Sequence, residues 1–567
     1  MAFYQDPPVL AHGYLSDRVL KSYLQRVMGE GPLAEIVGEL EHMGELASGE
    51  LFALQQEDRL NEPTLTQYDP WGRRIDHIEL TALWKRAREV ACQQGLVATA
   101  YDQAHGALSR VHQFSLVYLF EGSSDVYTCP LAMTDGAART LLAHRHPTLS
   151  ERAVPRLTSR DPARAWTSGQ WMTERTGGSD VGLSETVASP CEDTAQAFGC
   201  DKPYRLEGTK WFTSAVTSDM ALTLARTAGS PAGGRGLTLF YLETHHEDGS
   251  SNGIRVNRLK DKLGTRKLPT GELSLTDTLA VPVVGLGHGT RQIAPMLNIT
   301  RTWNAVCSVG AMRRGLALAR DFAGRRAQFG ASLSEQPLHV DTLAALQAEY
   351  EAAFHLAFWT VELLGRHEVG EASEHDLRLL RVLTPLAKLT TAKQCVATMS
   401  EVLECFGGAG YVEDTGIPRL LRDAQVLPIW EGTTNVLSLD VLRAIGAQRT
   451  LPALSETLSI LREDVRDGPL QEVAQAALRA FTHVQAMLDT LQPGSADEQR
   501  HARRIALTLG RTIAAGLLVR HGQWCLDHLN DRRPAWAACR FCAHGLDLLI
   551  PIGDAVQSRG LGTDVTD

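Results

Sequence analysis

The chain lacks the features that would assign it at once to a membrane or nucleotide-binding class. No apolar stretch approaches the ~18 residues of a membrane span, and Ile513 to Val519 is typical of the longest. A phosphate loop and a G-x-G-x-x-G fingerprint are both missing, because Gly285-Leu286-Gly287-His288-Gly289 does not fit either pattern. We therefore expect no membrane partner and no nucleotide site of these two kinds.

An excess of basic residues is also missing. The formal net charge of the 567 residues is −10, which argues against a general surface for nucleic acid or anionic membranes. Residues 451–567 contain 12 arginines, no lysine and 14 acidic residues, so this region is close to neutral. Arg503-Arg504 and Arg532-Arg533 could still form a local basic patch after folding.

No targeting signal is recognisable. The N-terminal segment has no basic region followed by an apolar core, and the C-terminal segment resembles no targeting or lipidation tag. Ten cysteines without an export signal are most simply reduced thiols, so we expect a cytoplasmic protein. Cysteines and histidines between 525 and 544 suggest a zinc site, but residues 535–550 read as a buried helix, where Cys is a common apolar residue. We expect no metal.

Composition is that of a globular protein, with 44% hydrophobic, 22% charged and only 6% aromatic residues. The length exceeds one core, so several structural units are expected. Helical periodicity covers much of the chain, whereas residues 166–285 contain short runs bounded by Gly, Asp, Asn and Pro, which indicate strands. The predicted units are an irregular N-terminal extension (1–80), a helical domain (81–165), a β domain (166–288), a helical bundle (289–446) and a further helical domain (447–567).

Glu431 is the first candidate for catalysis. It follows the apolar residues Pro428-Ile429-Trp430 and precedes a helix start marked by Gly432, Thr433, Thr434 and Asn435. Apolar neighbours disfavour the charged carboxylate, whereas a helix N-terminus favours it. Such opposed influences suit a group that accepts and later releases a proton. An ordinary acidic residue near a helix start is the alternative.

Two segments of the β region could hold a flat ligand. A strand at Trp171–Glu174 runs into Arg175–Gly182, where paired glycines permit close backbone approach and hydroxyls offer hydrogen bonds. The strand Gly208–Ser214 places an aromatic pair beside two hydroxyls, which suits a tricyclic ring system. A glycine-rich turn and a half-buried strand are the respective alternatives.

Two helix ends are also candidates. Arg325–Gly330 places cations in a last helical turn, where they would stabilise any helix. Glu404–Tyr411 ends a helix at glycines, and a plain C-terminal cap would have the same sequence. The bare backbone there could equally admit a phosphate or a sugar.

Taken in order, these segments resemble the acyl-CoA dehydrogenase family, whose flavoproteins oxidise acyl-CoA thioesters between Cα and Cβ. The resemblance covers about residues 80–446. The AidB-type branch, linked to the adaptive response to alkylating agents, is the more similar one. The stretches matching the family are 172–181, 208–214, 262–266, 326–330, 406–411 and 430–435, and those matching the branch are 68–74, 258–264, 438–443 and the extra C-terminal block.

The resemblance implies an α+β fold that is mainly α: an N-terminal helical domain, a central antiparallel β domain, a C-terminal helical bundle and an extra helical domain. It implies FAD as cofactor, acyl-CoA as substrate and a homotetramer built as a dimer of dimers. It also implies that Glu431 removes the α-proton while flavin N5 accepts the β-hydride. Some relatives supply this base near Thr300-Arg301, but neither residue is an acid here.

The remaining roles are implied in the same way, residue by residue. The family positions that hold the flavin and its ribityl chain, the FAD of a neighbouring subunit, or the segment just past the base fall on Met172, Thr173, Gly178, Ser179, Phe212, Thr213, Ser214, Arg326, Gln328, Phe329, Glu404, Gly407, Gly408, Thr433 and Asn435. Substrate contacts fall on Asn298, Arg301 and Gly432.

The sequence departs from the common family pattern at three of these positions. Phe212 stands where many members carry Trp, Gln328 where many carry Thr, and Glu404 where Gln is common. These changes leave flavin binding expected but put the usual substrate range in doubt.

Two functions remain open. The first is an acyl-CoA dehydrogenase that passes electrons to an electron-transfer flavoprotein. The second is an AidB-like protective protein that binds duplex DNA through residues 447–567, with vestigial dehydrogenase activity. Salt-sensitive phosphate binding requires clustered cations, and the near-neutral C-terminal region favours the enzyme. An acyl-CoA oxidase that uses oxygen would differ in solvent access to the flavin.

Overall fold

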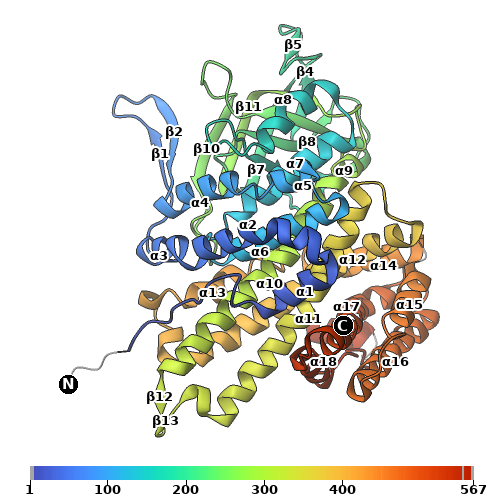
Figure 1. Cartoon of the computed structure of the whole chain (residues 1–567). Helices are drawn as coiled ribbons and strands as arrows, with labels where there is room; N and C mark the ends of the chain where they lie inside the picture. Colours follow the sequence, from blue (N-terminus) through green and yellow to red (C-terminus); the bar gives the residue numbers. More distant parts are fainter. Residues whose placement is uncertain (1–4, 449, 552–554, 564–567) are drawn as a thin grey trace.

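The computed structural model describes residues 5–448, 450–551 and 555–563. Helices form most of the molecule, and one β domain lies at the top of the view in Figure 1. The chain passes from an N-terminal helical layer into the β domain, then into long central helices and a final helical domain. This is the predicted α+β, mainly α architecture. No helix in the described part of the chain has the length and apolar content to cross a membrane.

The N-terminal layer begins earlier than predicted. Residues 1–80 were expected to be irregular, and this is wrong, because three helices and a hairpin occupy most of residues 18–79. The first helix is capped by Asp17, whose carboxylate accepts from Leu20 N at 3.0 Å, and it buries Val19, Leu20 and Tyr23. The elements of this layer are α1 (Arg18–Met28), α2 (Glu30–Ser48), α3 (Glu50–Glu57), β1 (Thr64–Tyr68), β2 (Arg74–Glu79), α4 (Ala82–Gln93), α5 (Ala98–Asp102), α6 (Ser109–Glu121), α7 (Thr128–Ala143) and α8 (Pro147–Leu157).

The β domain is a seven-stranded sheet with the order β10-β11-β7-β4-β8-β3, in which β9 pairs with both β8 and β11. Strands β11, β7, β4, β8 and β9 therefore form a closed path. The sheet is mainly antiparallel as predicted, but β8 pairs in parallel with β3 and β4. Its strands are β3 (Ser168–Trp171), β4 (Val187–Pro190), β7 (Tyr204–Thr213), β8 (Met220–Thr227), β9 (Leu237–Glu243), β10 (Ile254–Leu259) and β11 (Gly271–Pro282), with β5 (Gln196–Ala197) and β6 (Cys200–Asp201) as a separate pair.

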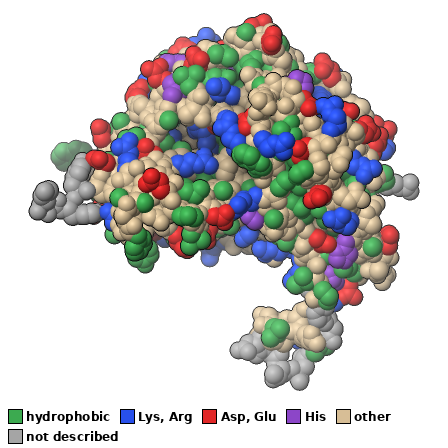
Figure 2. Space-filling view, turned by 60° about the horizontal axis from the view of Figure 1, so that its bottom comes forward, with side chains coloured by type: hydrophobic (Ala, Val, Ile, Leu, Met, Phe, Trp, Pro, Cys, Tyr) green, Lys and Arg blue, Asp and Glu red, His purple; other side chains and the backbone are tan. Residues whose placement is uncertain are grey.

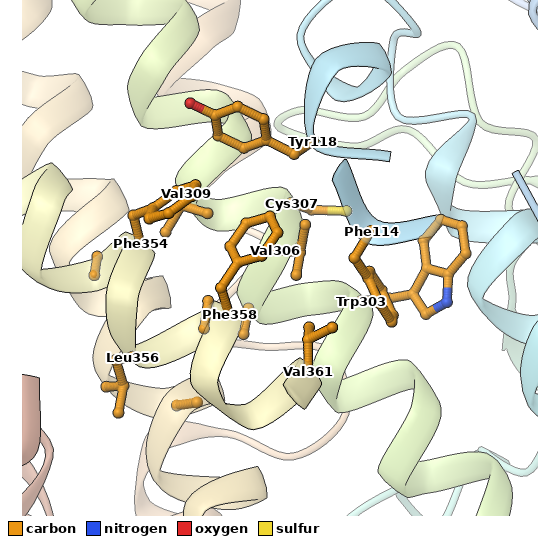
Figure 3. Close-up of a cluster of buried hydrophobic side chains, with 14 of the residues drawn as sticks. Phe114, Tyr118, Trp303, Val306, Cys307, Val309, Phe354, Leu356, Phe358 and Val361 are labelled. Atoms are coloured by element: carbon orange, nitrogen blue, oxygen red, sulfur yellow. The ribbon is translucent and has the colours of Figure 1, made fainter. Parts of the chain in front are cut away.

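Three helices of 32 residues each form the centre of the molecule, within the predicted helical bundle of residues 289–446. Figure 3 shows their core, where Phe354 and Phe358 of α11 pack against Val306 and Val309 of α10. Stacking of Phe354 on Phe358 at 4.3 Å contributes to this packing. The elements are α9 (Gly289–Gln292), α10 (Ala294–Arg325), β12 (Ala327–Gln328), β13 (Ala331–Ser332), α11 (Pro337–Glu368), α12 (Glu374–Cys405), α13 (Pro418–Ala424) and α14 (Thr434–Gln448).

The C-terminal helices pack against this bundle through α17, which contacts α11, α12 and α14. Helix α1 also reaches α17, because Ser22 Oγ lies 3.1 Å from His521 Nε2 in a buried contact. The helix predicted over 535–550 ends at Ala543, followed by a turn at Gly545 with φ +90°. The elements are α15 (Thr450–Ile460), α16 (Gly468–Thr490), α17 (Ala496–Leu529), α18 (Arg533–Ala543) and α19 (Ala555–Thr563).

Candidate functional site

Glu431 lies in the loop between α13 and α14, half-buried against α10. Thr300 Oγ1 of α10 donates a hydrogen bond to Glu431 Oε2 at 2.7 Å. A hydroxyl donor stabilises the ionised carboxylate and fixes its direction. The Glu431 carboxylate is therefore held by a residue that lies 131 positions away in the sequence.

The backbone of this loop adopts an unusual conformation. Glu431 has φ +56° and Gly432 has φ +102°. A non-glycine residue rarely occupies the left-handed region, so the surrounding structure must hold Glu431 there. Two cations do so: Arg301 Nε donates to the Glu431 carbonyl at 3.2 Å, and Lys388 Nζ donates to the Gly432 carbonyl at 2.7 Å.

Lys388 is a buried cation directly behind the loop. Burial lowers the pKa of its ammonium to about 7, and the nearby negative charge of Glu431 acts in the opposite direction. Lys388 was not among the site residues predicted from the sequence. A lysine inside the apolar helical run Leu386-Ala387-Lys388-Leu389 was a signal that could have pointed to it.

Asp440 anchors the same region from α14. It accepts hydrogen bonds from Arg301 Nη1 at 3.0 Å and from Arg381 Nη2 at 2.7 Å. Burial alone would raise the pKa of Asp440, but Arg381 and Arg301 outweigh it, and the pKa is lowered. Arg301 thus connects Glu431 to α14 rather than standing free toward a ligand.

The two predicted ligand-binding segments of the β domain meet each other. Strand β3 ends at Trp171, so Met172 and Thr173 lie in the following loop rather than in a strand. The Trp211 N–H donates to the Thr173 carbonyl at 3.0 Å. Below them, Lys210 Nζ donates to Glu174 Oε1 at 2.7 Å in a buried ion pair. This pair fixes the loop after β3 onto β7.

The surface of these segments suits a flat ring with a polyhydroxyl chain. Phe212 is an aromatic side chain left 59% exposed, and Lys260 lies 4.7 Å from its ring centre. The buried Thr213 Oγ1 has no hydrogen-bond partner among the described residues. A Cβ at Gly178 would lie 2.5 Å from Thr173 Oγ1, so the backbone approaches this hydroxyl closely. Exposed aromatic surface and an orphaned hydroxyl fit the flavin implied by the resemblance.

Glu431 and the β-domain segments are connected through Cys129 of α7. Burial is the main reason that the pKa of the Cys129 thiol is raised to about 12; the charge of Lys262 opposes this rise, the negative charge of Glu431 adds to it, and Ser214 is near enough to lower the pKa slightly. Cys129 is therefore close to Ser214 and within electrostatic range of Glu431. The predicted base and the predicted ring-binding segment border the same region.

Other predicted site residues lie far from Glu431 in the same chain. Arg326 lies 26 residues beyond Thr300, so helix α10 separates them by about 39 Å. The Arg326 segment instead approaches the end of α12, because the rings of Phe322 and Phe406 are 4.8 Å apart. Exposed members of the two segments are Phe329, Glu404, Gly407 and Gly408, and Gln328 is half-buried.

The remaining predicted residues contribute less to the geometry. Asn298 and Thr433 are exposed, and Thr433 Oγ1 accepts from Val436 N at 3.4 Å. Asn435 Oδ1 accepts from Arg503 Nη1 of α17 at 3.3 Å, which brings the C-terminal domain to the start of α14. Within the described part of the chain, no group of three or more His, Cys, Asp or Glu side chains is arranged to hold a metal ion.

Three family models match the chain. The model described as acyl-CoA dehydrogenase, C-terminal domain, matches residues 287–446, and that of the acyl-CoA dehydrogenase middle domain matches residues 169–278. The model described as adaptive response protein AidB N-terminal domain matches residues 6–162. Together these models cover most of the chain.

Curated relatives and solved structures agree with the family models. Acyl-CoA dehydrogenase family member 11 of Caenorhabditis elegans is 42% identical over 535 residues, which span 92% of this chain and 85% of that protein. The putative acyl-CoA dehydrogenase AidB of Escherichia coli K12 is 34% identical over 449 residues, 77% of this chain and 78% of that protein. The crystal structure of C. elegans ACDH-11 in complex with C11-CoA matches with a TM-score of 0.92 at 39% identity, covering 97% of this chain and 94% of that one.

Proposed function

The chain belongs to the acyl-CoA dehydrogenase family, and we propose that it oxidises acyl-CoA thioesters to 2,3-enoyl-CoA with Glu431 as the catalytic base. The observation that carries this proposal is the Thr300–Glu431 hydrogen bond of 2.7 Å, which holds the carboxylate of the predicted base against α10. A positioned base contributes about 10²–10⁴-fold to proton abstraction.

Glu431 takes the proton from Cα of the substrate. The thioester α-proton is weakly acidic, so its removal requires donors to the developing enolate oxygen. Backbone N–H groups at Glu431 and Gly432 are the candidates in this chain. Both residues have positive φ values, and hydrogen bonds from Arg301 and Lys388 hold their two carbonyls.

FAD is the proposed cofactor, and when bound it supplies the acceptor for the β-hydride. Phe212 would contact the ring, and the hydroxyls of Thr173, Thr213 and Ser214 would hydrogen-bond to it or to its chain. The exposure of Phe212 and the orphaned Thr213 hydroxyl support this assignment. Met172, Gly178 and Ser179 belong to the same group.

We propose a homotetramer in which each subunit contributes to its neighbour's cofactor site. Phe329 is 99% exposed at the tip of the β12–β13 turn, at the opposite end of the molecule from the β domain in Figure 1. A bulky aromatic side chain so exposed fits an interface residue. Arg326, Gln328, Glu404, Gly407 and Gly408 would then hold the FAD of a neighbouring subunit rather than that of their own.

The electron acceptor we propose is an electron-transfer flavoprotein, and the compartment is the cytoplasm. All ten cysteines are free thiols, which fits a reducing environment. Binding of duplex DNA by the C-terminal domain is less well supported. Arg532 pairs with Asp467 at 3.0 Å and Arg533 with Asp531 at 2.8 Å, so acids already neutralise one of the two predicted patches. In Figure 2 the basic side chains of one face are interspersed with acidic and apolar ones.

An anaerobic titration tests the proposed reaction. The FAD-loaded protein is mixed with a panel of acyl-CoA thioesters that includes C11-CoA, the ligand present in the ACDH-11 structure. Bleaching of the flavin absorbance by at least one thioester, with the 2,3-enoyl-CoA as product, is expected. A flavin-loaded protein that binds thioesters but is reduced by none would show that the proposed reaction is wrong.

A further inference from the structure

We propose that the cavity between the N-terminal segment, α3, α10 and α13 is a second ligand site, which binds a small organic carboxylate with an apolar body. The cavity has a volume of about 350 Å³ and lies away from Glu431. Figure 1 shows the N-terminal segment passing beside α13. The volume is within the range of small-molecule sites.

The walls of the cavity combine apolar side chains with two cations. Arg314 and Arg419 are its charged residues, and Asp and Glu are absent from the described residues that line it. The apolar and polar walls come from segments far apart in the sequence. The lining residues that bear on ligand chemistry are Val9, Phe52, Gln55, Leu318, Ile417 and Leu420.

Arg314 is only 3% exposed, and only one of its three guanidinium nitrogens has hydrogen-bond partners among the described residues. Its Nη2 donates to Ser123 Oγ and to the Ala47 carbonyl. Its Nε and Nη1 have no hydrogen-bond partner among the described residues. Buried polar groups are nearly always satisfied, so two nitrogens with three unused N–H groups on one buried guanidinium indicate a missing acceptor.

The surrounding charges favour an anion. Burial, together with the neighbouring cations Arg313 and Arg419, lowers the pKa of Arg314 to about 9. Arg313 is engaged by Asp17. Arg419 Nη1 lies 2.8 Å from Asp125 Oδ1, but the angle gives no hydrogen bond at that nitrogen. An anion between Arg314 and Arg419 would offset their repulsion and accept the unused N–H groups.

The acids near these arginines line a second cavity and are not among the residues that line the first. Glu121, Asp125 and Asp423 line a smaller adjoining cavity of about 50 Å³, which also touches Arg314 and Arg419. Burial raises the pKa of Glu121 to about 7 and that of Asp423 to about 6, so near neutral pH these two carboxyls neutralise less positive charge than two ordinary acids would. The larger cavity therefore keeps a positive end and an apolar body.

The cavity is distinct from the proposed catalytic site. Arg314 lies 14 residues beyond Thr300 on α10, which corresponds to about 21 Å along the helix. Carboxylates suit the site better than inorganic anions, because most of its lining is apolar. The guanidinium of Arg314 lies 5.2 Å from the Phe52 ring centre, so a bound carboxylate would meet a cation with an aromatic wall beside it.

The test uses hexanoate as the probe with the FAD-loaded full chain. Thermal midpoints of unfolding are measured against hexanoate concentration. Hexan-1-ol and hexylammonium serve as comparison probes, because they have the same six-carbon chain but no negative charge. Hexanoate alone should raise the midpoint. Arg314→Met should weaken the effect about tenfold or more, because charge-assisted hydrogen bonds are lost. Ala53→Phe, at an exposed position of the cavity rim, should also weaken it.

Arg320→Met is the matched control, since Arg320 is on the same helix but does not line the cavity. It should leave the hexanoate effect unchanged. A soak with 6-bromohexanoate should place the bromine in the cavity with the carboxylate at Arg314. If hexanoate competes with acyl-CoA equally well in the wild type and in Arg314→Met, hexanoate binds in the catalytic site, and this result would overturn the proposal. Equal stabilisation by all three probes, or none by hexanoate, would also overturn it.

Discussion

Lys388 donates a 2.7 Å hydrogen bond from α12 to the carbonyl of Gly432, the residue that follows the proposed base. A cation buried in a central helix thus holds the loop that carries Glu431. Thr300 holds the carboxylate of the same residue from α10. Two long helices therefore determine the position of one loop residue, whose own backbone conformation is unfavourable.

Glu431→Gln should retain FAD and acyl-CoA binding but slow flavin reduction by about 10²–10⁴-fold. The amide preserves the shape and can still accept from Thr300, whereas it cannot take the α-proton. Stopped-flow reduction under anaerobic conditions measures the step, with Glu401→Gln on exposed α12 surface as control. Near-normal reduction in Glu431→Gln would assign the base to another residue.

Thr300→Val should slow flavin reduction by roughly tenfold or more, because the charged carboxylate loses a hydrogen bond worth about 1.5–3 kcal/mol. Valine keeps the shape of threonine, so packing in α10 is preserved. Thr300→Ser keeps the hydroxyl and should retain most of the activity. If valine and serine behave alike, the hydrogen bond does not position the base.

Lys388→Met should change how the thermal midpoint depends on pH. The folded-state pKa of Lys388 is about 7, below its ordinary value of 10.5. Between about pH 7 and pH 10.5 the folded state therefore binds fewer protons at Lys388 than the unfolded state does. The free energy of unfolding that Lys388 contributes at high pH is consequently lost as pH falls from about 10.5 to about 7. The midpoint of wild type should thus rise relative to that of Lys388→Met between pH 7 and pH 10. Lys393→Met, on the same helix, should follow wild type.

Acid should loosen the contact between α1 and α17. His521 and His355 are buried with ring centres 4.3 Å apart, and burial and neighbouring arginines lower the pKa of both well below 6.5. The two neutral histidines contribute stability to the folded state above pH 6.5, and this contribution is lost as pH falls below that value. Hydrogen exchange should show α1 and α17 losing protection first at pH 5 to 6. His521→Gln should reduce this pH dependence, while His77→Gln in the exposed β2 should not.

Arg326→Ala should weaken FAD retention and tetramer assembly together. A guanidinium can hold a pyrophosphate with two parallel hydrogen bonds, which alanine cannot replace. Sedimentation velocity and flavin content are measured on the same samples. Arg325→Ala, which removes the exposed neighbour paired with Asp321, is the control. A wild-type protein that is a flavin-loaded monomer would contradict the cross-subunit assignment.

The long helices could be predicted because their signals are local. Helices α10, α11 and α12 lie within the helical bundle predicted over 289–446, and strands β8, β9 and β11 lie within the β domain predicted over 166–288. The prediction of an irregular N-terminal extension was wrong, because Pro and polar residues near its ends obscured the helical spacing of Val19, Leu20 and Tyr23. These three residues are buried in the protein. The helix over 535–550 was too long because Gly545 turns the chain with a positive φ.

The sequence by itself determined the family, the order of the units, the proposed base Glu431 and the β-domain segments at 172–179 and 208–214, since each is a short run of neighbouring residues. Only the tertiary structure decided which residues support that base and where a second ligand could bind. Thr300 and Lys388 meet the Glu431–Gly432 loop across 131 and 44 residues. Whether the N–H groups of Arg314 find acceptors depends on how α10 packs against α6, α7 and α13. Burial and hydrogen-bond partners depend on how distant elements pack, and local sequence carries no record of that packing.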